Sequence, residues 1–296
     1  MKTVMVLVCF LAGSVVSAVG EGAEEGGVRE VRDVVWAVGP EGGEDLMVDF
    51  YLPEGVEKAP LVLFIHGGGW KNGDRKRCRL AWLAEHGYAV ASVDYRLSHE
   101  GLFPAQIHDC KGALRWLRAN AAEYGVDADR VVVAGTSAGG HLAALMGTSG
   151  EVEELEGVTG GNESESSRVQ GIIDYFGPTD FVLRSKHKPE KTEEPDGSVY
   201  LLLGGPVRDN EERAKLASPV FHVTADDPPL LIVHGDEDKT VDIGQSERLA
   251  AVYEDEGLDV TLHVVEGAGH GWKGPKEAER EAVLGFLEAR LGTPGG

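Results

Sequence analysis

One serine stands where bulky side chains are missing on both sides. The stretch Gly135-Thr136-Ser137-Ala138-Gly139 has the form G-x-S-x-G, follows an apolar run at residues 130–134 and leads directly into an apolar helical pattern. A strand-to-helix turn of this kind holds a nucleophile in a strained conformation, and the flanking glycines keep other side chains away from it. The context predicts that Ser137 is a nucleophile, although the pentapeptide alone would also suit an ordinary glycine turn.

A serine hydroxyl becomes a good nucleophile when a base accepts its proton, and that base needs an acid to fix its tautomer. Carboxylates occur at Asp236, Glu237, Asp238 and Asp242 after one apolar run, and His270 lies in a glycine-rich stretch after the next run. Asp238 lies far enough beyond its strand to turn back toward His270. Asp236 is its main rival for the role of the acid, with Asp242 behind.

Two further histidines near these segments have a structural interpretation. His234 ends the apolar run that precedes Asp238, and His141 lies four residues beyond Ser137, about one helical turn along. We expect both imidazoles to pack or to cap rather than to react.

A glycine run supplies the third requirement of acyl transfer, which is a site for the negative charge on the carbonyl oxygen. Because they lack side chains, Gly67, Gly68 and Gly69 can aim backbone N–H groups at that oxygen. Ala138 adds the N–H that follows the nucleophile. Each such donor can stabilise the transition state by about 3 kcal/mol.

Strand-like and helical patterns alternate along most of the chain. The runs at residues 28–38 and 46–52 suit antiparallel strands near one edge of a sheet. The later runs are almost wholly apolar, as parallel strands covered on both faces must be. They lie at residues 60–67, 88–95, 130–135, 169–177, 228–238 and 259–270, with helical patterns at residues 76–86, 105–124, 138–146, 243–255 and 276–291.

This order predicts an α/β fold with an eight-stranded, mostly parallel sheet and helices on both faces. Catalytic groups gather at the carboxyl edge of such a sheet, so the serine, acid and histidine segments should meet there. We expect a single domain at residues 28–296. It is interrupted at about residues 177–229 by loops or a partial lid, because this part is charged and broken by prolines.

The N-terminus resembles a secretory signal peptide at residues 1–18, with Lys2, an apolar stretch and small residues at the end. A flexible acidic segment follows at residues 19–27. The apolar stretch is short for a bilayer span, so we expect a secreted or periplasmic protein with no membrane span after cleavage; a retained anchor is the alternative.

The net charge of −22, from 50 acidic against 28 basic residues, opposes binding to nucleic acid. Cleavage of the signal would remove Cys9 and leave Cys78 and Cys110, which form either one disulfide or two free thiols. The oligomeric state stays open.

The segments HGGGW, GTSAGG, HGDEDKTV and GAGHGW, in this order, resemble the α/β-hydrolase superfamily. The likeness is greatest to secreted carboxylesterases of the bifunctional feruloyl/acetylxylan esterase and hormone-sensitive-lipase-like groups, and it extends from about residue 30 to residue 291. The resemblance implies no metal or organic cofactor. The roles it implies are nucleophile for Ser137, general base for His270, orienting acid for Asp238, and oxyanion donors for the amides of Gly68, Gly69 and Ala138.

The substrate that the resemblance implies is a short acyl or aromatic-acid ester, such as an acetyl or feruloyl group on a polysaccharide. Trp70, Phe103, Tyr175 and Phe181 are candidate pocket walls, although apolar residues near strand ends also belong to cores. The alternatives are a prolyl-oligopeptidase-like peptidase, which shares the elbow and the acid loop, and a catalytically silent binding protein on the same scaffold.

Overall fold

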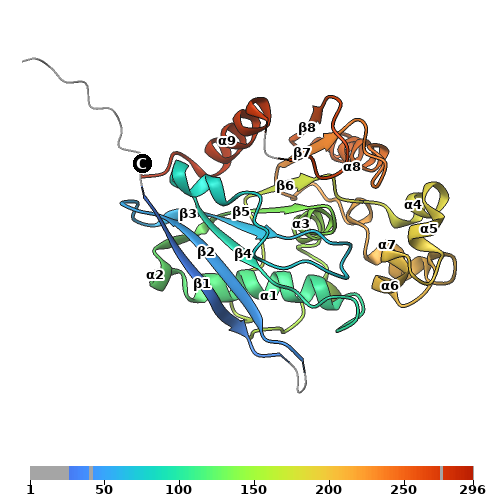
Figure 1. Cartoon of the computed structure of the whole chain (residues 1–296), viewed down its shortest axis with the longest axis horizontal. Coiled ribbons are helices and arrows are strands. Elements are labelled where there is room, and N and C mark those ends of the chain that lie inside the picture. Colours follow the sequence, from blue (N-terminus) through green and yellow to red (C-terminus); the bar gives the residue numbers. More distant parts are fainter. Residues whose placement is uncertain (1–26, 40–42, 274–275, 296) are drawn as a thin grey trace, which may run out of the picture.

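The computed structural model of the protein describes residues 27–39, 43–273 and 276–295. The expected signal peptide and nearly all of the acidic segment after it lie outside the described residues. The centre is one eight-stranded sheet in the order β1-β2-β4-β3-β5-β6-β7-β8 (Figure 1). The strands are β1 (Val28–Ala37), β2 (Leu46–Pro53), β3 (Ala59–Ile65), β4 (Ala89–Val93), β5 (Val126–Thr136), β6 (Gly171–Tyr175), β7 (Leu230–Gly235) and β8 (Val260–Val265).

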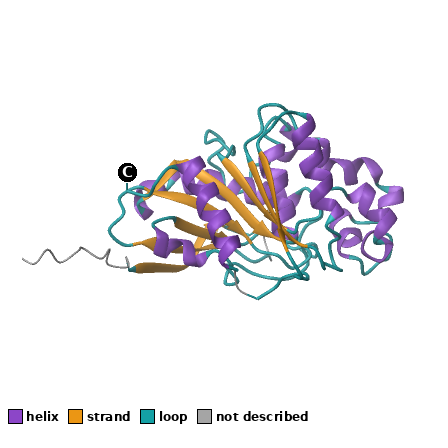
Figure 2. Cartoon of the chain, turned by 90° about the horizontal axis from the view of Figure 1, so that it is seen from above, coloured by secondary structure: helices purple, strands orange, loops and turns teal. Residues whose placement is uncertain are grey.

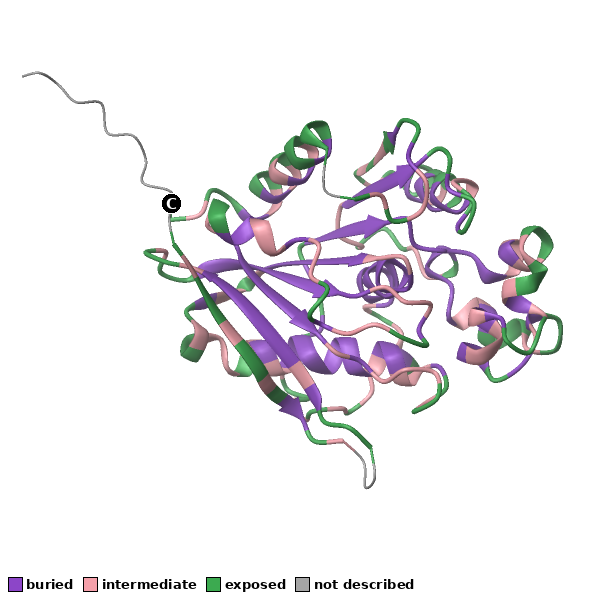
Figure 3. Cartoon of the chain, in the orientation of Figure 1, coloured by how far each residue is buried: buried purple, intermediate pink, exposed green. Residues whose placement is uncertain are grey.

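The direction of the strands agrees with the sequence pattern. β1 pairs with β2 and β2 with β4 in antiparallel fashion, whereas every other neighbouring pair is parallel. The apolar strands β3, β4, β6 and β7 are buried along their whole length, while β1 at the edge has mostly exposed or half-buried residues (Figure 3). The predicted α/β fold is therefore confirmed.

Helices cover both faces of the sheet because successive side chains of a strand point to opposite sides (Figure 2). In β3, Leu61 and Leu63 pack in the cluster that includes α1 and α3, while Val62 and Phe64 pack in the cluster that includes α9. The α-helices outside the insertion are α1 (Ala105–Ala119), α2 (Ala121–Tyr124), α3 (Ala138–Thr148), α8 (Gly244–Asp255) and α9 (Glu277–Leu291), and the 3-10 helices there are η1 (Ala81–His86) and η2 (Glu153–Leu155).

Two helix predictions need correction. The helix expected at residues 76–86 is only the 3-10 turn η1, because tertiary contacts hold the preceding residues: Arg75 bonds to Asp94 through both its backbone N–H and its guanidinium. The single helix expected at residues 105–124 divides at Asn120, whose side-chain amide donates to the carbonyl of Trp116.

The segment between β6 and β7 is largely helical where loops were expected. Figure 1 shows α4 to α7 gathered on one side of the sheet, and we call residues 177–229 the insertion. Its elements are α4 (Phe181–His187), α5 (Pro189–Thr192), α6 (Ser198–Leu203), η3 (Val207–Asp209), α7 (Glu211–Leu216) and η4 (Pro219–Phe221). The helices are short, which explains why the sequence shows no long amphipathic period there.

Candidate active site

Ser137 stands at the sharp turn between β5 and α3. Its φ of 54° and ψ of −115° are strained for a residue with a side chain. A Cβ on Gly135 would lie 2.1 Å from the carbonyl oxygen of Gly139, and a Cβ on Gly139 would lie 2.1 Å from that of Ile65. Both glycines of the pentapeptide are thus required by close backbone contacts, as a nucleophile elbow demands.

The structure brings Ser137, His270 and Asp238 together from three loops. His270 Nε2 lies 3.0 Å from Ser137 Oγ, and His270 Nδ1 lies 2.6 Å from Asp238 Oδ2. Because Nδ1 faces a carboxylate, it carries the proton, which leaves Nε2 free to accept from the serine hydroxyl. The order of contacts is the one that converts a serine hydroxyl into a nucleophile.

The Asp238 side chain is buried and fully hydrogen-bonded. Its Oδ1 accepts from the amides of Thr240 at 2.7 Å and Val241 at 2.9 Å, while Oδ2 faces His270. Burial raises the pKa of this carboxyl, but the contacts with His234 and His270 and the amide of Val241 outweigh burial and hold the pKa well below its usual range. Asp238 is therefore ionised at neutral pH.

The two rival carboxylates brace loops. Asp236 Oδ1 accepts from the amide of Gly267 at 2.7 Å, and Asp242 Oδ1 accepts from the amide of Gly244 at 2.9 Å. The structure gives neither of them a contact with His270 among the described residues.

His234 is fully buried behind the acid. Its Nδ1 lies 2.6 Å from Ser246 Oγ, and its Nε2 lies 3.0 Å from the carbonyl oxygen of Val241 and 3.3 Å from Asp238 Oδ2. A packing role was expected from the sequence, but its contact with the acid was not, since nothing in the pattern places the imidazole against that side chain.

The loop after β3, which contains the predicted oxyanion donors Gly68 and Gly69, has an unusual backbone conformation. Gly68, Gly69 and Trp70 have φ values of 124°, 63° and 56°, so three consecutive residues lie at positive φ. In the described part of the chain, the amides of Gly68, Gly69 and Ala138 donate no hydrogen bond, and all three residues line the cavity that holds Ser137. Free amides beside a nucleophile can stabilise a developing oxyanion.

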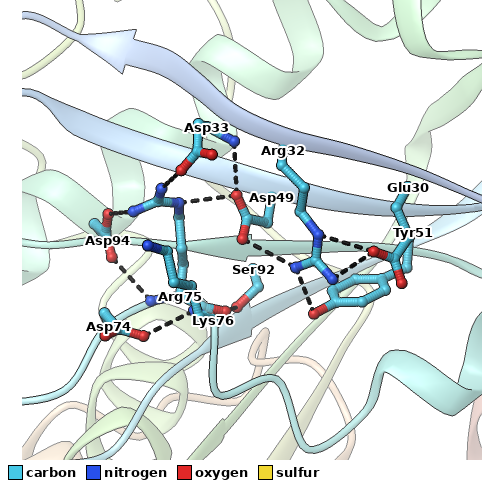
Figure 4. A network of polar contacts seen from close by, with 10 residues as sticks. All are labelled: Glu30, Arg32, Asp33, Asp49, Tyr51, Asp74, Arg75, Lys76, Ser92 and Asp94. Carbon is cyan, nitrogen blue, oxygen red and sulfur yellow. Dashed lines mark hydrogen bonds and ion pairs between the residues drawn. The ribbon is translucent and has the colours of Figure 1, made fainter.

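A buried polar network anchors this loop to the sheet (Figure 4). The guanidinium of Arg75 donates to Asp49 Oδ1 at 2.9 Å and to Asp94 Oδ2 at 2.7 Å, and it also contacts Asp33. Ser92 Oγ donates to the carbonyl of Arg75 at 2.6 Å. Since Asp49 lies on β2 and Ser92 on β4, the network holds the end of the loop against two strands.

The cavity over Ser137 has a volume of about 730 Å³ and two kinds of wall. Its apolar lining residues include Trp70, Phe176 and Pro178. Its polar lining residues come mostly from the insertion and from the end of the glycine loop that follows β3; they include Lys71, Asn72, Arg184, Glu190, Lys191, Glu194, Asp196 and Ser198. Sequence reasoning noted the charged stretch in the insertion but could not tell which of its residues turn inward.

Of the four predicted pocket walls, only Trp70 lines this cavity. Phe181 is fully buried behind Trp70, with ring centroids 5.5 Å apart. Tyr175 is also buried, with the guanidinium of Arg79 over its ring, and Phe103 borders a separate depression beside α7. The prediction is therefore wrong for Phe103, Tyr175 and Phe181, which belong to the core.

The disulfide left open by the sequence is not formed. Cys78 and Cys110 are both free, and burial raises the pKa of the Cys110 thiol.

No helix in the described residues is long and apolar enough to span a bilayer. Those residues likewise contain no group of three or more His, Cys, Asp or Glu placed to hold a metal ion.

Residues 48–253 match the model of the family described as BD-FAE. The chain belongs to the BD-FAE family. This result confirms the resemblance to α/β-hydrolase esterases drawn from the four motifs, and the family match includes Ser137 and Asp238.

Relatives of this BD-FAE chain include esterase LipC of Mycobacterium tuberculosis, which is 33% identical over 224 residues, or 73% of this chain and 54% of LipC. Esterase LipQ of the same organism is 33% identical, over 74% of this chain and 52% of LipQ. The BD-FAE chain thus spans about half the length of these two relatives.

A solved structure, the truncated form of a carbohydrate esterase from gut microbiota, superimposes on the BD-FAE chain with a TM-score of 0.81 and 31% identity, over 91% of this chain and 98% of that one. A bifunctional GH43-CE protein of Bacteroides eggerthii gives a TM-score of 0.79 and 30% identity, over 89% of this chain and 38% of that one. Propionate-bound Est2 of Thermogutta terrifontis gives 0.66 and 26%, over 90% and 92%.

Proposed function

We propose that this protein is a serine esterase that cleaves carboxylic esters through an acyl-serine intermediate. The observation that carries the proposal is the unbroken line of contacts from Ser137 through His270 to Asp238, beside free amides and under a cavity of about 730 Å³. Membership of the BD-FAE family and likeness to LipC and to a carbohydrate esterase support it.

The reaction proceeds in two halves. Ser137 Oγ attacks the ester carbonyl while its proton passes to His270 Nε2, and the amides of Gly68, Gly69 and Ala138 stabilise the tetrahedral oxyanion. When this tetrahedral intermediate collapses, the bond between the acyl carbon and the alcohol oxygen breaks, and the alcohol oxygen takes the proton from His270. Water then gives a proton to His270 and attacks the acyl-serine; the second collapse returns that proton to Ser137 and releases the acid.

The substrates we propose are short acyl or aromatic-acid esters of sugars, such as acetyl or feruloyl groups on polysaccharide. The apolar wall with Trp70 and Phe176 suits the acyl group, and the polar wall with Asn72 and Asp196 suits a hydroxyl-rich alcohol. Secretion, proposed from residues 1–18, would bring the enzyme to such material. N-terminal sequencing of the exported protein tests this, since an intact Met1 contradicts cleavage.

The test of the activity is hydrolysis of nitrophenyl acetate and labelling by a fluorophosphonate. We expect both to be lost in Ser137→Ala, and hydrolysis to be lost in His270→Ala. Full turnover in either variant contradicts the proposal, and absence of labelling in the wild type would favour a silent scaffold. Acetylated xylan, methyl ferulate and a proline amide then separate the ester classes from a peptidase.

A further inference from the structure

His141 is a residue of α3 whose ring lies between the glycine loop and the insertion. It lies one turn beyond Ser137 in α3, is fully buried, and its backbone N–H donates to the carbonyl of Ser137 at 2.9 Å. Its ring has no part in the proposed reaction, yet both ring nitrogens have partners.

These partners fix the state of the imidazole. Trp70 Nε1 lies 3.2 Å from His141 Nδ1, and the carbonyl oxygen of Ala217 lies 2.6 Å from His141 Nε2. An indole N–H can only donate and a carbonyl can only accept, so Nδ1 is the acceptor and Nε2 carries the proton. Burial outweighs the hydrogen bond to Ala217, which raises the pKa of His141, and lowers this pKa to about 4, so the ring is neutral at neutral pH.

The bond to Trp70 acts on the candidate oxyanion loop. Trp70 directly follows Gly68 and Gly69 and has a φ of 56°, a backbone state that persists in a tryptophan only when its surroundings hold it. Its carbonyl is held by the backbone N–H of Ser98 at 2.7 Å and by Ser98 Oγ at 3.0 Å, and its indole is held by His141. The side-chain bond is thus one of the restraints on the loop.

The bond to Ala217 comes from the far end of the insertion. Ala217 follows α7, and Phe181 at the start of α4 stacks on the His141 ring with centroids 4.9 Å apart. The beginning and the end of the insertion therefore both rest on one imidazole, whose opposite nitrogen holds Trp70.

We propose that His141 is a positioning residue through which the seated insertion fixes Trp70, and hence the oxyanion amides of Gly68 and Gly69. The proposal rests on the esterase function proposed above. It assigns a role in the reaction to a histidine that touches no reacting atom, and it makes the insertion part of the support of the oxyanion hole as well as a wall of the cavity.

Two substitutions separate the two bonds. His141→Asn keeps an acceptor at the place of Nδ1 for Trp70 but does not reach Ala217, whereas His141→Gln places its amide N–H near Nε2 for Ala217 and loses the near acceptor for Trp70. We expect kcat of His141→Gln on nitrophenyl acetate to fall about 10- to 100-fold with KM little changed, because misplacing catalytic donors acts on the transition state. The fall in kcat should be smaller in His141→Asn than in His141→Gln.

A second measurement tests the link to Trp70. Affinity for a trifluoromethyl ketone, which forms an oxyanion adduct with Ser137, should fall in step with kcat/KM in His141→Gln. In a Trp70→Phe background, which has no indole N–H, His141→Gln should cause little further loss of kcat. Urea unfolding of each variant checks that the chain is folded.

The outcomes are distinct from those that test the esterase function. An inactive, unlabelled wild type overturns the proposed function. An active wild type with unchanged kcat in His141→Gln overturns the positioning role, and so do fully additive losses in the Trp70→Phe background. The positioning role is also overturned if His141→Asn and His141→Gln lose kcat equally and these losses follow only the decrease in folding stability.

Discussion

His234 and His270 both contact the same oxygen of Asp238. Nε2 of His234 lies 3.3 Å and Nδ1 of His270 lies 2.6 Å from Oδ2. Since Val241 also binds both His234 and the other oxygen, the carboxylate cannot rotate away from His270 without breaking several contacts. Several contacts thus fix the orientation of the Asp238 side chain, so a substitution of Asp238 is an informative test.

We expect Asp238→Asn to lower kcat by about 10⁴-fold, because an amide no longer favours the required tautomer of His270 or stabilises its protonated form. Asp236→Asn is the matched control, since its side chain braces Gly267 and its amide oxygen can still accept that bond. The measurement is kcat on nitrophenyl acetate. A larger loss in the Asp236 variant would mean that the acid is wrongly assigned.

The glycine loop provides a second prediction. A Cβ on Gly68 would lie 1.8 Å from the carbonyl oxygen of Asn72, so Gly68→Ala must shift the loop. We expect kcat to fall by about 10²-fold or more as donors to the oxyanion move. Gly257→Ala is the control: its φ is 72° and no atom lies within 4 Å of the added Cβ. It should weaken folding by about 1 kcal/mol and leave kcat unchanged.

The ion pair between Arg75 and Asp49 is buried and those of Arg168 are exposed, so we expect the loss of either arginine to change the free energy of unfolding by different amounts. Arg75→Leu leaves Asp49, which is 1% exposed, short of one buried partner, and should lower the free energy of unfolding by about 3–5 kcal/mol. Arg168→Ala breaks pairs with Glu151 and Asp226 at the surface and should cost at most about 1 kcal/mol. Urea unfolding of both variants checks this, and equal losses would contradict it.

The pKa of His141 predicts part of the acid sensitivity of the fold. Burial lowers this pKa from 6.5 to about 4, so the unfolded chain binds more protons between these values. The contribution of the neutral ring to the free energy of unfolding is fully present above pH 6.5. As the pH falls to about 4, about 3 kcal/mol of this contribution is lost. His141→Asn lacks this loss, so the difference in free energy of unfolding between wild type and variant should shrink as the pH falls through this range. A constant difference would contradict the prediction.

Much of the fold and of the candidate site could be predicted from the sequence, because the informative features are local. Apolar strand runs and a G-x-S-x-G turn depend on neighbouring residues, and the carboxyl edge of a parallel sheet brings their ends together. The fold followed from these patterns, and the contacts among Ser137, Asp238 and His270 agree with the geometry expected for them.

What was missed depends on tertiary contacts. Phe181 lies next to Trp70 but behind it, and no local pattern shows which side of a tryptophan a distant ring will take. His234 and His141 were read as packing residues, and only the fold shows what their nitrogens contact. The charged insertion could be located by composition, whereas its short helices depend on tertiary contacts such as the stacking of Phe181 on His141 and the bond from Arg184 to the carbonyl of Thr240.

The outer strand β1 has a consequence for how the protein behaves in solution. Its exposed Arg29, Glu30, Arg32 and Asp33 and its irregular pairing with β2 make that border a poor template for another chain. A molecule adding a strand there would have to dehydrate charges and match a bulged ladder. Exchanging those four charged residues for apolar ones would promote aggregation through the unprotected border.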